Sequence, residues 1–132
     1  ALGINYYHGE AVSARPPAEA PLSSAAPSDR PKLSPFPAGE GIHAHPRGLP
    51  VTAMDWEVQP EGLTRLLVRI DEEYARPAGV TLYVTENGAA YTDEVAADGS
   101  VDDADRAEFV RLHLDAILDA IDQGVNVQGY FY

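Results

Sequence analysis

Two stretches of the chain place apolar side chains at helical spacing, with polar side chains on the opposite side. In residues 60–77 this pattern predicts an amphipathic helix that starts at Pro60 and is stopped by Pro77. In residues 101–124 it predicts a longer helix, with acidic residues near its N-terminus and Gly124 at its end. The two stripes comprise Leu63, Leu66, Leu67, Ile70 and Tyr74, and Phe109, Leu112, His113, Ala116, Ile117, Ala120 and Ile121. We therefore expect two helices, each with one apolar side.

Three shorter runs of apolar and β-branched residues predict strands at residues 2–7, 79–86 and 125–132. The middle run is apolar on both faces, which is typical of a strand that is covered on both sides. Residues 11–50 hold nine of the eleven prolines, which excludes a long helix or a central strand and indicates a long proline-rich loop. The expected order is strand, long loop, helix, strand, helix, strand.

This order predicts an α/β fold whose strands pair in parallel through helical crossovers. Two architectures share it: a doubly wound sheet and a (β/α)8 TIM barrel. Three strands cannot close a barrel, which needs roughly 250 residues, so a barrel would leave this chain as about its last third. The chain begins in a strand and ends in an aromatic run, so we expect residues 1–132 to be a single partial domain.

The composition of the chain limits which binding partners and which cellular compartment are expected. The net charge of −12 leaves no cluster of lysine and arginine to bind phosphates, so nucleic acid and anionic membranes are poor partners. No apolar run is long enough to span a membrane. The chain has no cysteine, which excludes disulfides and thiolate chemistry and is compatible with a reducing compartment, so a cytoplasmic location is the expectation.

Candidate catalytic groups lie where strands end, because loops at the carboxyl ends of parallel strands converge on one mouth. Glu86 lies in "VTENG", at the point where the second strand turns. Simple alternation places it on the same face as Leu82 and Val84, the face that would look into a barrel. A solvated carboxylate at a strand end is the ordinary interpretation. A carboxylate held beside a hydroxyl donor would instead suit nucleophilic attack at an acetal carbon.

Four motifs resemble those of glycoside hydrolase family 1, the retaining β-glucosidases. The family's Ile/Val-Thr-Glu-Asn-Gly motif is matched by "VTENG", and its strand-six motif by "LGINYY". Its element before the following helix is matched by "MDWEVQPEGL", and its run into strand eight by "AIDQGVNVQGYF". The motifs occur in the family's order and cover most of the chain outside the proline-rich loop. The resemblance implies a portion of a (β/α)8 barrel, roughly strands six to eight.

The resemblance also implies roles for four residues. Glu86 would be the nucleophile that forms a glycosyl-enzyme intermediate, and Tyr7 would donate its hydroxyl to that carboxylate. Asn5 would hydrogen-bond near the 2-hydroxyl of the sugar, and Trp56 would be a platform for the leaving group. Two ordinary alternatives remain at this point. Tyr7 and Asn5 would satisfy each other at a strand end, and Trp56 would belong to the core.

The chain departs from the family pattern at two points. Asp55 replaces a glycine that commonly precedes the tryptophan, so the local backbone is expected to differ. The family's acid/base glutamate lies in a Thr-x-Asn-Glu-Pro motif, and these 132 residues contain no such motif. We therefore expect a fragment of a retaining β-glycosidase that is inactive alone. Its partners would be a β-linked glucoside or oligosaccharide and the remainder of the barrel, and no cofactor is expected.

Two other functional classes stay open. The first is a non-catalytic sugar-binding relative that lacks the acid/base glutamate. The second is an unrelated doubly wound binding module, which would require a glycine-rich phosphate loop after a strand, and the sequence has none.

The histidines are interpreted separately. His43 and His45 lack a credible third ligand, so no metal site is predicted and a solvated loop is expected there. His113 lies on an apolar stripe and is expected to pack in the core. His8 follows Tyr7 and is a candidate for the mouth of the site.

Overall fold

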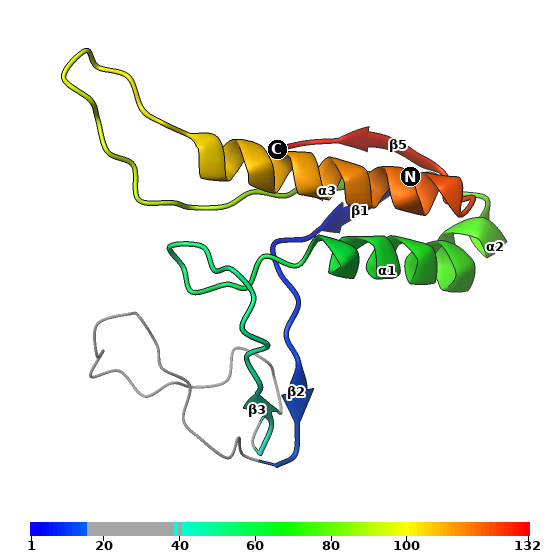
Figure 1. The fold of residues 1–132 in the computed structure, drawn as a ribbon. Helices are drawn as coiled ribbons and strands as arrows, with labels where there is room; N and C mark the ends of the chain where they lie inside the picture. The colour runs from blue at the N-terminus through cyan, green and yellow to red at the C-terminus, as the bar shows by residue number, and fades with distance from the viewer. Residues whose placement is uncertain (16–38, 40) are drawn as a thin grey trace.

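The computed structural model describes residues 1–15, 39 and 41–132, and its centre is a three-stranded sheet. The strands are β1 (Leu2–Asn5), β4 (Leu82–Glu86) and β5 (Val127–Tyr130). Both pairings are parallel, in the order β1-β4-β5, so the predicted parallel pairing is confirmed. Figure 1 shows β1 and β5 running in the same direction beside helices α1 and α3.

One face of the sheet is covered by α1 (Pro60–Ile70) and α3 (Ala104–Asp122). Leu82 and Val84 of the central strand are fully buried against this helical layer. Burial of such apolar side chains is the main source of stability in the fold. The other members of the core cluster are Ile4, Tyr6, Leu63, Leu67, Ala75, Ala116, Ile117, Ala120 and Val125.

The first helix differs from its prediction at its C-terminal end. Pro60 occupies a first-turn position, as predicted, but Pro77 lies within the last turn, α2 (Arg76–Ala78), and does not stop the helix. A π-helical turn, η1 (Asp71–Ala75), precedes it, and the chain leaves the helix at Gly79, with φ of 63°. A proline lacks the N–H of a regular helix, and the wider turn accommodates this.

The π-helical turn also shifts which side chains face the core. A regular helix would continue the apolar stripe from Leu67 through Tyr74, but Tyr74 is 60% exposed and Ala75 is buried. The extra residue in the turn rotates the following positions by about one place. Tyr74 is therefore wrongly predicted as a core residue, because the pattern assumes a uniform period of 3.6 residues.

His113 packs in the core, as predicted. Its ring is fully buried and stacks on Phe109, with the ring centroids 3.9 Å apart. The Nδ1 atom lies 2.8 Å from the carbonyl oxygen of Phe109, so Nδ1 carries the proton and donates. Among the described residues, Nε2 has no hydrogen-bond partner. Burial lowers the pKa of this imidazole more than the hydrogen bond to Phe109 raises it.

Two segments extend from the carboxyl ends of the strands (Figure 1). One is the 87–103 loop, and the other is an antiparallel pair, β2 (Val12–Ser13) and β3 (His43–Ala44). This pair lies within the predicted 11–50 loop, of which residues 16–38 and 40 lie outside the described part. Both strands are only two residues long, and among the described residues of this segment neither joins the central sheet.

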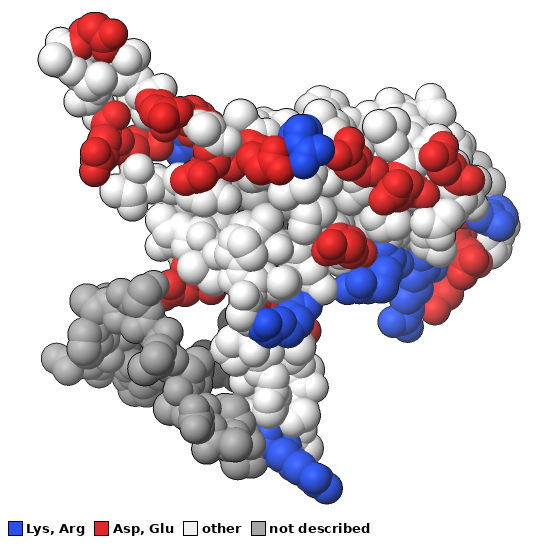
Figure 2. Space-filling view, in the orientation of Figure 1, with Lys and Arg blue, Asp and Glu red and all other residues white. Residues whose placement is uncertain are grey.

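The two helices differ in their share of charged side chains on one face of the molecule. Figure 2 shows mostly acidic side chains along α3, with a basic one among them, and a group of basic side chains over α1 with acidic ones beside it. In the described part, arginines at five positions lie in ion pairs with carboxylates, namely Arg47, Arg69, Arg76, Arg106 and Arg111. None of the helices in this part is both long enough and apolar enough to cross a membrane.

Candidate active site

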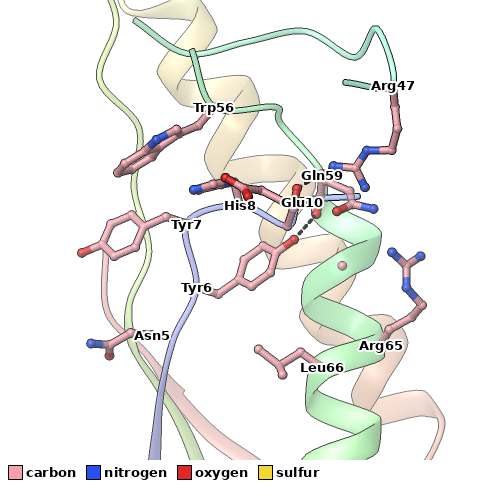
Figure 3. Close-up of a pocket in the computed structure, with 12 residues that line it drawn as sticks. Asn5, Tyr6, Tyr7, His8, Glu10, Arg47, Trp56, Gln59, Arg65 and Leu66 are labelled. Atoms are coloured by element: carbon pink, nitrogen blue, oxygen red, sulfur yellow. Dashed lines mark hydrogen bonds between the residues drawn. The ribbon is translucent and has the colours of Figure 1, made fainter. Parts of the chain in front are cut away.

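A cavity of about 560 Å³ opens at the carboxyl end of β1, on the edge of the sheet. Its walls come from the chain after β1, the loop before α1 and the first turns of α1 (Figure 3). The side chains that matter below are Asn5, Tyr7, His8, Arg47, Trp56 and Gln59. Three of the four predicted site residues, all except Glu86, thus line one cavity.

An irregularity in strand pairing places Glu86 next to this cavity. Ile4 pairs with Val84, but Asn5 pairs with Glu86, so two residues of β4 face one residue of β1. In such a β-bulge, Thr85 and Glu86 point toward the same side of the sheet. Glu86 therefore leaves the face that holds Val84, and the prediction that these two share a face is wrong. The carboxylate lies instead on the open face, opposite the helices.

The structure brings Glu86 and Tyr7 together. The Tyr7 hydroxyl donates a hydrogen bond of 2.7 Å to Oε2 of Glu86. This hydrogen bond is the largest of the effects that raise the pKa of Tyr7. The phenol therefore stays protonated at neutral pH and acts as a donor, while the carboxylate accepts. Tyr7 also lines the cavity, so the carboxylate of Glu86 is hydrogen-bonded to a residue of the cavity wall.

Asn87 anchors the end of β4, and the sequence analysis assigned it no role. Its side chain is buried and makes two hydrogen bonds to the neighbouring strands. Nδ2 donates to the carbonyl oxygen of Tyr6 at 2.6 Å, and Oδ1 accepts from the Tyr130 hydroxyl at 2.9 Å. Asn87 thus ties all three strand ends together directly after Glu86. Its signal in the sequence is an amide that immediately follows the carboxylate at a strand end.

Asn5 is hydrogen-bonded to Thr85 and not to Tyr7, the partner considered from the sequence. Thr85 donates its hydroxyl to Oδ1 of Asn5 at 2.7 Å, whereas Tyr7 bonds to Glu86. The alternative in which Tyr7 and Asn5 satisfy each other is therefore wrong. The contact fixes the amide of Asn5, whose Nδ2 group is a donor.

Trp56 borders the cavity and is not a core residue. It is half-buried, and its ring stacks on His8 with centroids 4.7 Å apart and planes at 19°. The ring of Tyr7 lies 5.8 Å away at a tilt of 57°. His8, Tyr7 and Trp56 thus form one aromatic group, which supports the expectation that His8 lies at the mouth of the site.

Asp55 adopts the backbone conformation that glycine adopts freely. Its φ is 58°, in the left-handed region, and aspartate is one of the few other residues that enter this region readily. The turn before Trp56 therefore accepts aspartate at a position where the family commonly has glycine.

The start of α1 is fixed to β1 by Tyr6. The Tyr6 hydroxyl donates to the carbonyl oxygen of Gln59 at 2.7 Å, and a Cβ atom at Gly62 would collide with that hydroxyl. Burial raises the pKa of Tyr6 to about 12, so this hydroxyl is a permanent donor. The contact sets the distance between α1 and the segment after β1 that carries Tyr6 and Tyr7.

The described residues contain no group of three potential metal ligands. His45 Nε2 lies within hydrogen-bond distance of the Ser13 hydroxyl and of the carbonyl oxygen of Arg15. These contacts link His45 to the segment that contains β2.

Comparison with known proteins places this geometry in a family. A model described as glycosyl hydrolase family 1 matches residues 1–132. Beta-glucosidase A of Thermotoga maritima is 37% identical over 130 residues, which cover 98% of this chain and 24% of that protein. A 6-phospho-beta-galactosidase of Clostridium acetobutylicum is 44% identical over 93 residues, which cover 70% of this chain and 19% of that protein.

Solved structures give the same result. The crystal structure of the psychrophilic beta-glucosidase BglU from Micrococcus antarcticus superposes with a TM-score of 0.86 at 48% identity. That match covers 98% of this chain and 27% of the other. The chain therefore spans about a quarter of the length of these relatives.

Proposed function

Because this chain belongs to glycosyl hydrolase family 1, we propose that it is the nucleophile-bearing part of a retaining β-glycosidase with a (β/α)8 barrel, roughly strands six to eight. The observation that carries the proposal is the hydrogen bond from Tyr7 to Glu86. It supplies a carboxylate that is oriented, and that stays an acceptor, at the carboxyl end of a parallel sheet.

In the proposed reaction, Glu86 attacks the anomeric carbon and forms a covalent glycosyl-enzyme, which water then hydrolyses. A second carboxyl group, about 5 Å from the first, protonates the leaving oxygen and later activates the water. The family's motif for that residue is absent from these 132 residues, so the proposal assigns this second carboxyl group to another part of the protein. Tyr7 orients the nucleophile, and Asn5 donates toward the 2-hydroxyl.

We further propose a β-glucoside as the substrate. The named relatives include beta-glucosidases and 6-phospho-beta-galactosidases, so the family leaves the sugar open. At equal coverage of 98% of this chain, the beta-glucosidase from Micrococcus antarcticus is 48% identical, whereas a 6-phospho-beta-galactosidase of Streptococcus mutans is 35% identical. The greater identity at equal coverage favours an unphosphorylated glucoside.

We also propose that residues 1–132 are inactive by themselves. The open face of the sheet carries the nucleophile, and Phe131 and Tyr132 beyond β5 are 59% and 55% exposed. The proposed partner for these surfaces is the remainder of the barrel. Hydrolysis of an aryl β-glucoside by the purified 132-residue chain would contradict this.

The test of the proposed nucleophile uses a full-length protein. Residues 1–132 are expressed either in their parent protein or in place of the matching segment of the Micrococcus antarcticus enzyme. Glu86→Ala should abolish hydrolysis of an aryl β-glucoside, and azide should restore turnover. Azide then occupies the side from which the carboxylate attacks, so the product should be the α-configured glycosyl azide. Glu94→Ala, at an exposed position in the 87–103 loop, is the matched control.

The alternatives to Glu86 as the nucleophile of an active enzyme predict different results. Formation of the β-configured azide would show that Glu86 acts as the acid/base group and not as the nucleophile. A full-length protein that binds glucosides but hydrolyses none, with Glu86 intact, would indicate the non-catalytic relative.

A further inference from the structure

Arg47 contacts the neighbours of both rings in the His8–Trp56 stack. Its Nη2 donates to the carbonyl oxygen of Gly9, next to His8, at 2.6 Å. Its Nε donates to Oε2 of Glu57, next to Trp56, at 2.7 Å. One guanidinium therefore spans the two segments that carry the stacked rings.

Both carboxylate oxygens of Glu57 accept hydrogen bonds from Arg47. Its Oε1 accepts from the backbone N–H of Arg47 at 2.5 Å and from that of Leu49 at 3.4 Å. The side chain of Glu57 keeps 13% of its surface exposed, and that of Arg47 keeps 28%. Burial raises the pKa of the Glu57 carboxyl, but the hydrogen bonds from Arg47 and Leu49 outweigh it and lower the pKa on balance. The pair is thus charged and largely shielded from solvent, where it is stronger than a surface pair.

The geometry points to Arg47 as a positioning residue that sets the orientation of Trp56 through Glu57 and Gly9. This inference rests on the proposed function, in which Trp56 is the platform for the leaving group. Figure 3 shows Arg47 and Trp56 apart from each other on the walls of the cavity, so the arginine acts through its bonded neighbours. A guanidinium suits this task because its fork can donate in two directions at once, whereas a lysine ammonium has no fixed fork.

The reaction sequence predicts which step this arginine affects. The leaving group contacts Trp56 only until the glycosyl-enzyme has formed, since it departs in the first chemical step. Loss of the platform should therefore slow formation of the intermediate and leave its hydrolysis unchanged. An arginine needed only for folding would give no such division between the two steps.

The experiment is a double-mutant cycle in the full-length protein, with kcat/KM for an aryl β-glucoside as the readout. The variants are Arg47→Ala, Trp56→Ala and their combination. Arg69→Ala is the matched control, because Arg69 of α1 forms an exposed pair with Glu73 of η1. Arg47→Lys and Glu57→Gln are milder variants that serve if Arg47→Ala does not fold. The rate of hydrolysis of a pre-formed 2-fluoroglycosyl-enzyme reports the second step.

We expect Arg47→Ala to lower kcat/KM roughly tenfold, but less than twofold when Trp56 is already alanine, because both changes remove the same platform. Hydrolysis of the pre-formed intermediate should stay within about twofold of the parent rate, and Arg47→Lys should recover only part of the loss. Additive effects in the cycle, or equal losses in both steps, would overturn the inference. So would full activity in Arg47→Ala, or in both Arg47→Lys and Glu57→Gln. Both readouts assume a glycosyl-enzyme intermediate at Glu86, and the 2-fluoro label reports its formation. Failure of the proposed function therefore appears separately, as absence of that label.

Discussion

Tyr7 and Glu86 lie 79 positions apart in the sequence, and their side chains meet through a hydrogen bond of 2.7 Å. Two local features make the meeting possible. The bulge opposite Asn5 turns Glu86 toward the open face of the sheet, and Asn87 then fixes the strand end from the other side. The geometry of the proposed nucleophile is therefore set by strand pairing and not by the loop that follows it.

Tyr7→Phe tests the contribution of this contact to activity. The ring remains, but the donor to Glu86 is lost, so the carboxylate is less well oriented. We expect kcat/KM for an aryl β-glucoside to fall about 10- to 100-fold, as is typical when a donor is removed from a reacting centre. Tyr74→Phe is the control, because Tyr74 is 60% exposed on the helical side. Equal activity of Tyr7→Phe and the parent would show that the Tyr7 hydroxyl does not contribute to catalysis.

Asn87→Ala tests the anchor behind the nucleophile. The substitution leaves the carbonyl oxygen of Tyr6 and the hydroxyl of Tyr130 without their partner in a buried region. We expect a loss of about 2 kcal/mol in the free energy of unfolding, measured by denaturant titration. Tyr130→Phe removes one bond and leaves Oδ1 of Asn87 unpaired, so about 1 kcal/mol is expected. A stability of Asn87→Ala equal to the parent's would show that the strand ends do not depend on this amide.

His113 makes stability depend on pH. Its folded-state pKa is lowered from the ordinary value of 6.5. As the pH falls, the imidazole is therefore protonated in the unfolded chain before it is protonated in the folded chain. The contribution to stability is present above about pH 6.5 and is lost as the pH falls below that value. His113→Leu should therefore weaken the decline in unfolding free energy between about pH 7 and pH 5. An unchanged slope would contradict the assignment of a buried neutral imidazole.

Substitutions at Asp55 test the backbone conformation of the turn before Trp56. Its left-handed φ of 58° suits glycine and is costly for a β-branched residue. We expect Asp55→Gly to change the free energy of unfolding by less than about 1 kcal/mol, and Asp55→Val to lower it by about 2 kcal/mol. Thermal unfolding of the two variants provides the comparison. A valine variant as stable as the glycine variant would show that the backbone relaxes at this position.

Much of the fold follows from periodic patterns. The apolar stripe from Leu63 to Leu67 and the stripe through Phe109 and His113 identify both helices, because burial on one side imposes helical spacing. The strands follow from β-branched runs, and their parallel pairing follows from the helices between them. The contact between Tyr7 and Glu86 came from the family resemblance, since no spacing rule relates residues so far apart.

What the patterns missed are local departures from a uniform period. The bulge moved Glu86 to the other face of the sheet, and the π-helical turn moved Tyr74 out of the core. Both depend on hydrogen bonding between particular backbone groups, which side-chain periodicity does not encode. The pairing of Arg47 with Glu57 was missed for a similar reason, since both lie outside the periodic segments.

The central claim is that Glu86 is the group that becomes covalently bound to the sugar. The direct measurement is to treat the full-length protein with a 2-deoxy-2-fluoro-β-glucoside that carries a good leaving group, and then to locate the label by peptide mass spectrometry. We expect one sugar per chain, on the peptide that contains "VTENG", and no label in Glu86→Gln. A sugar attached to any other residue, or labelling that persists in Glu86→Gln, would contradict it.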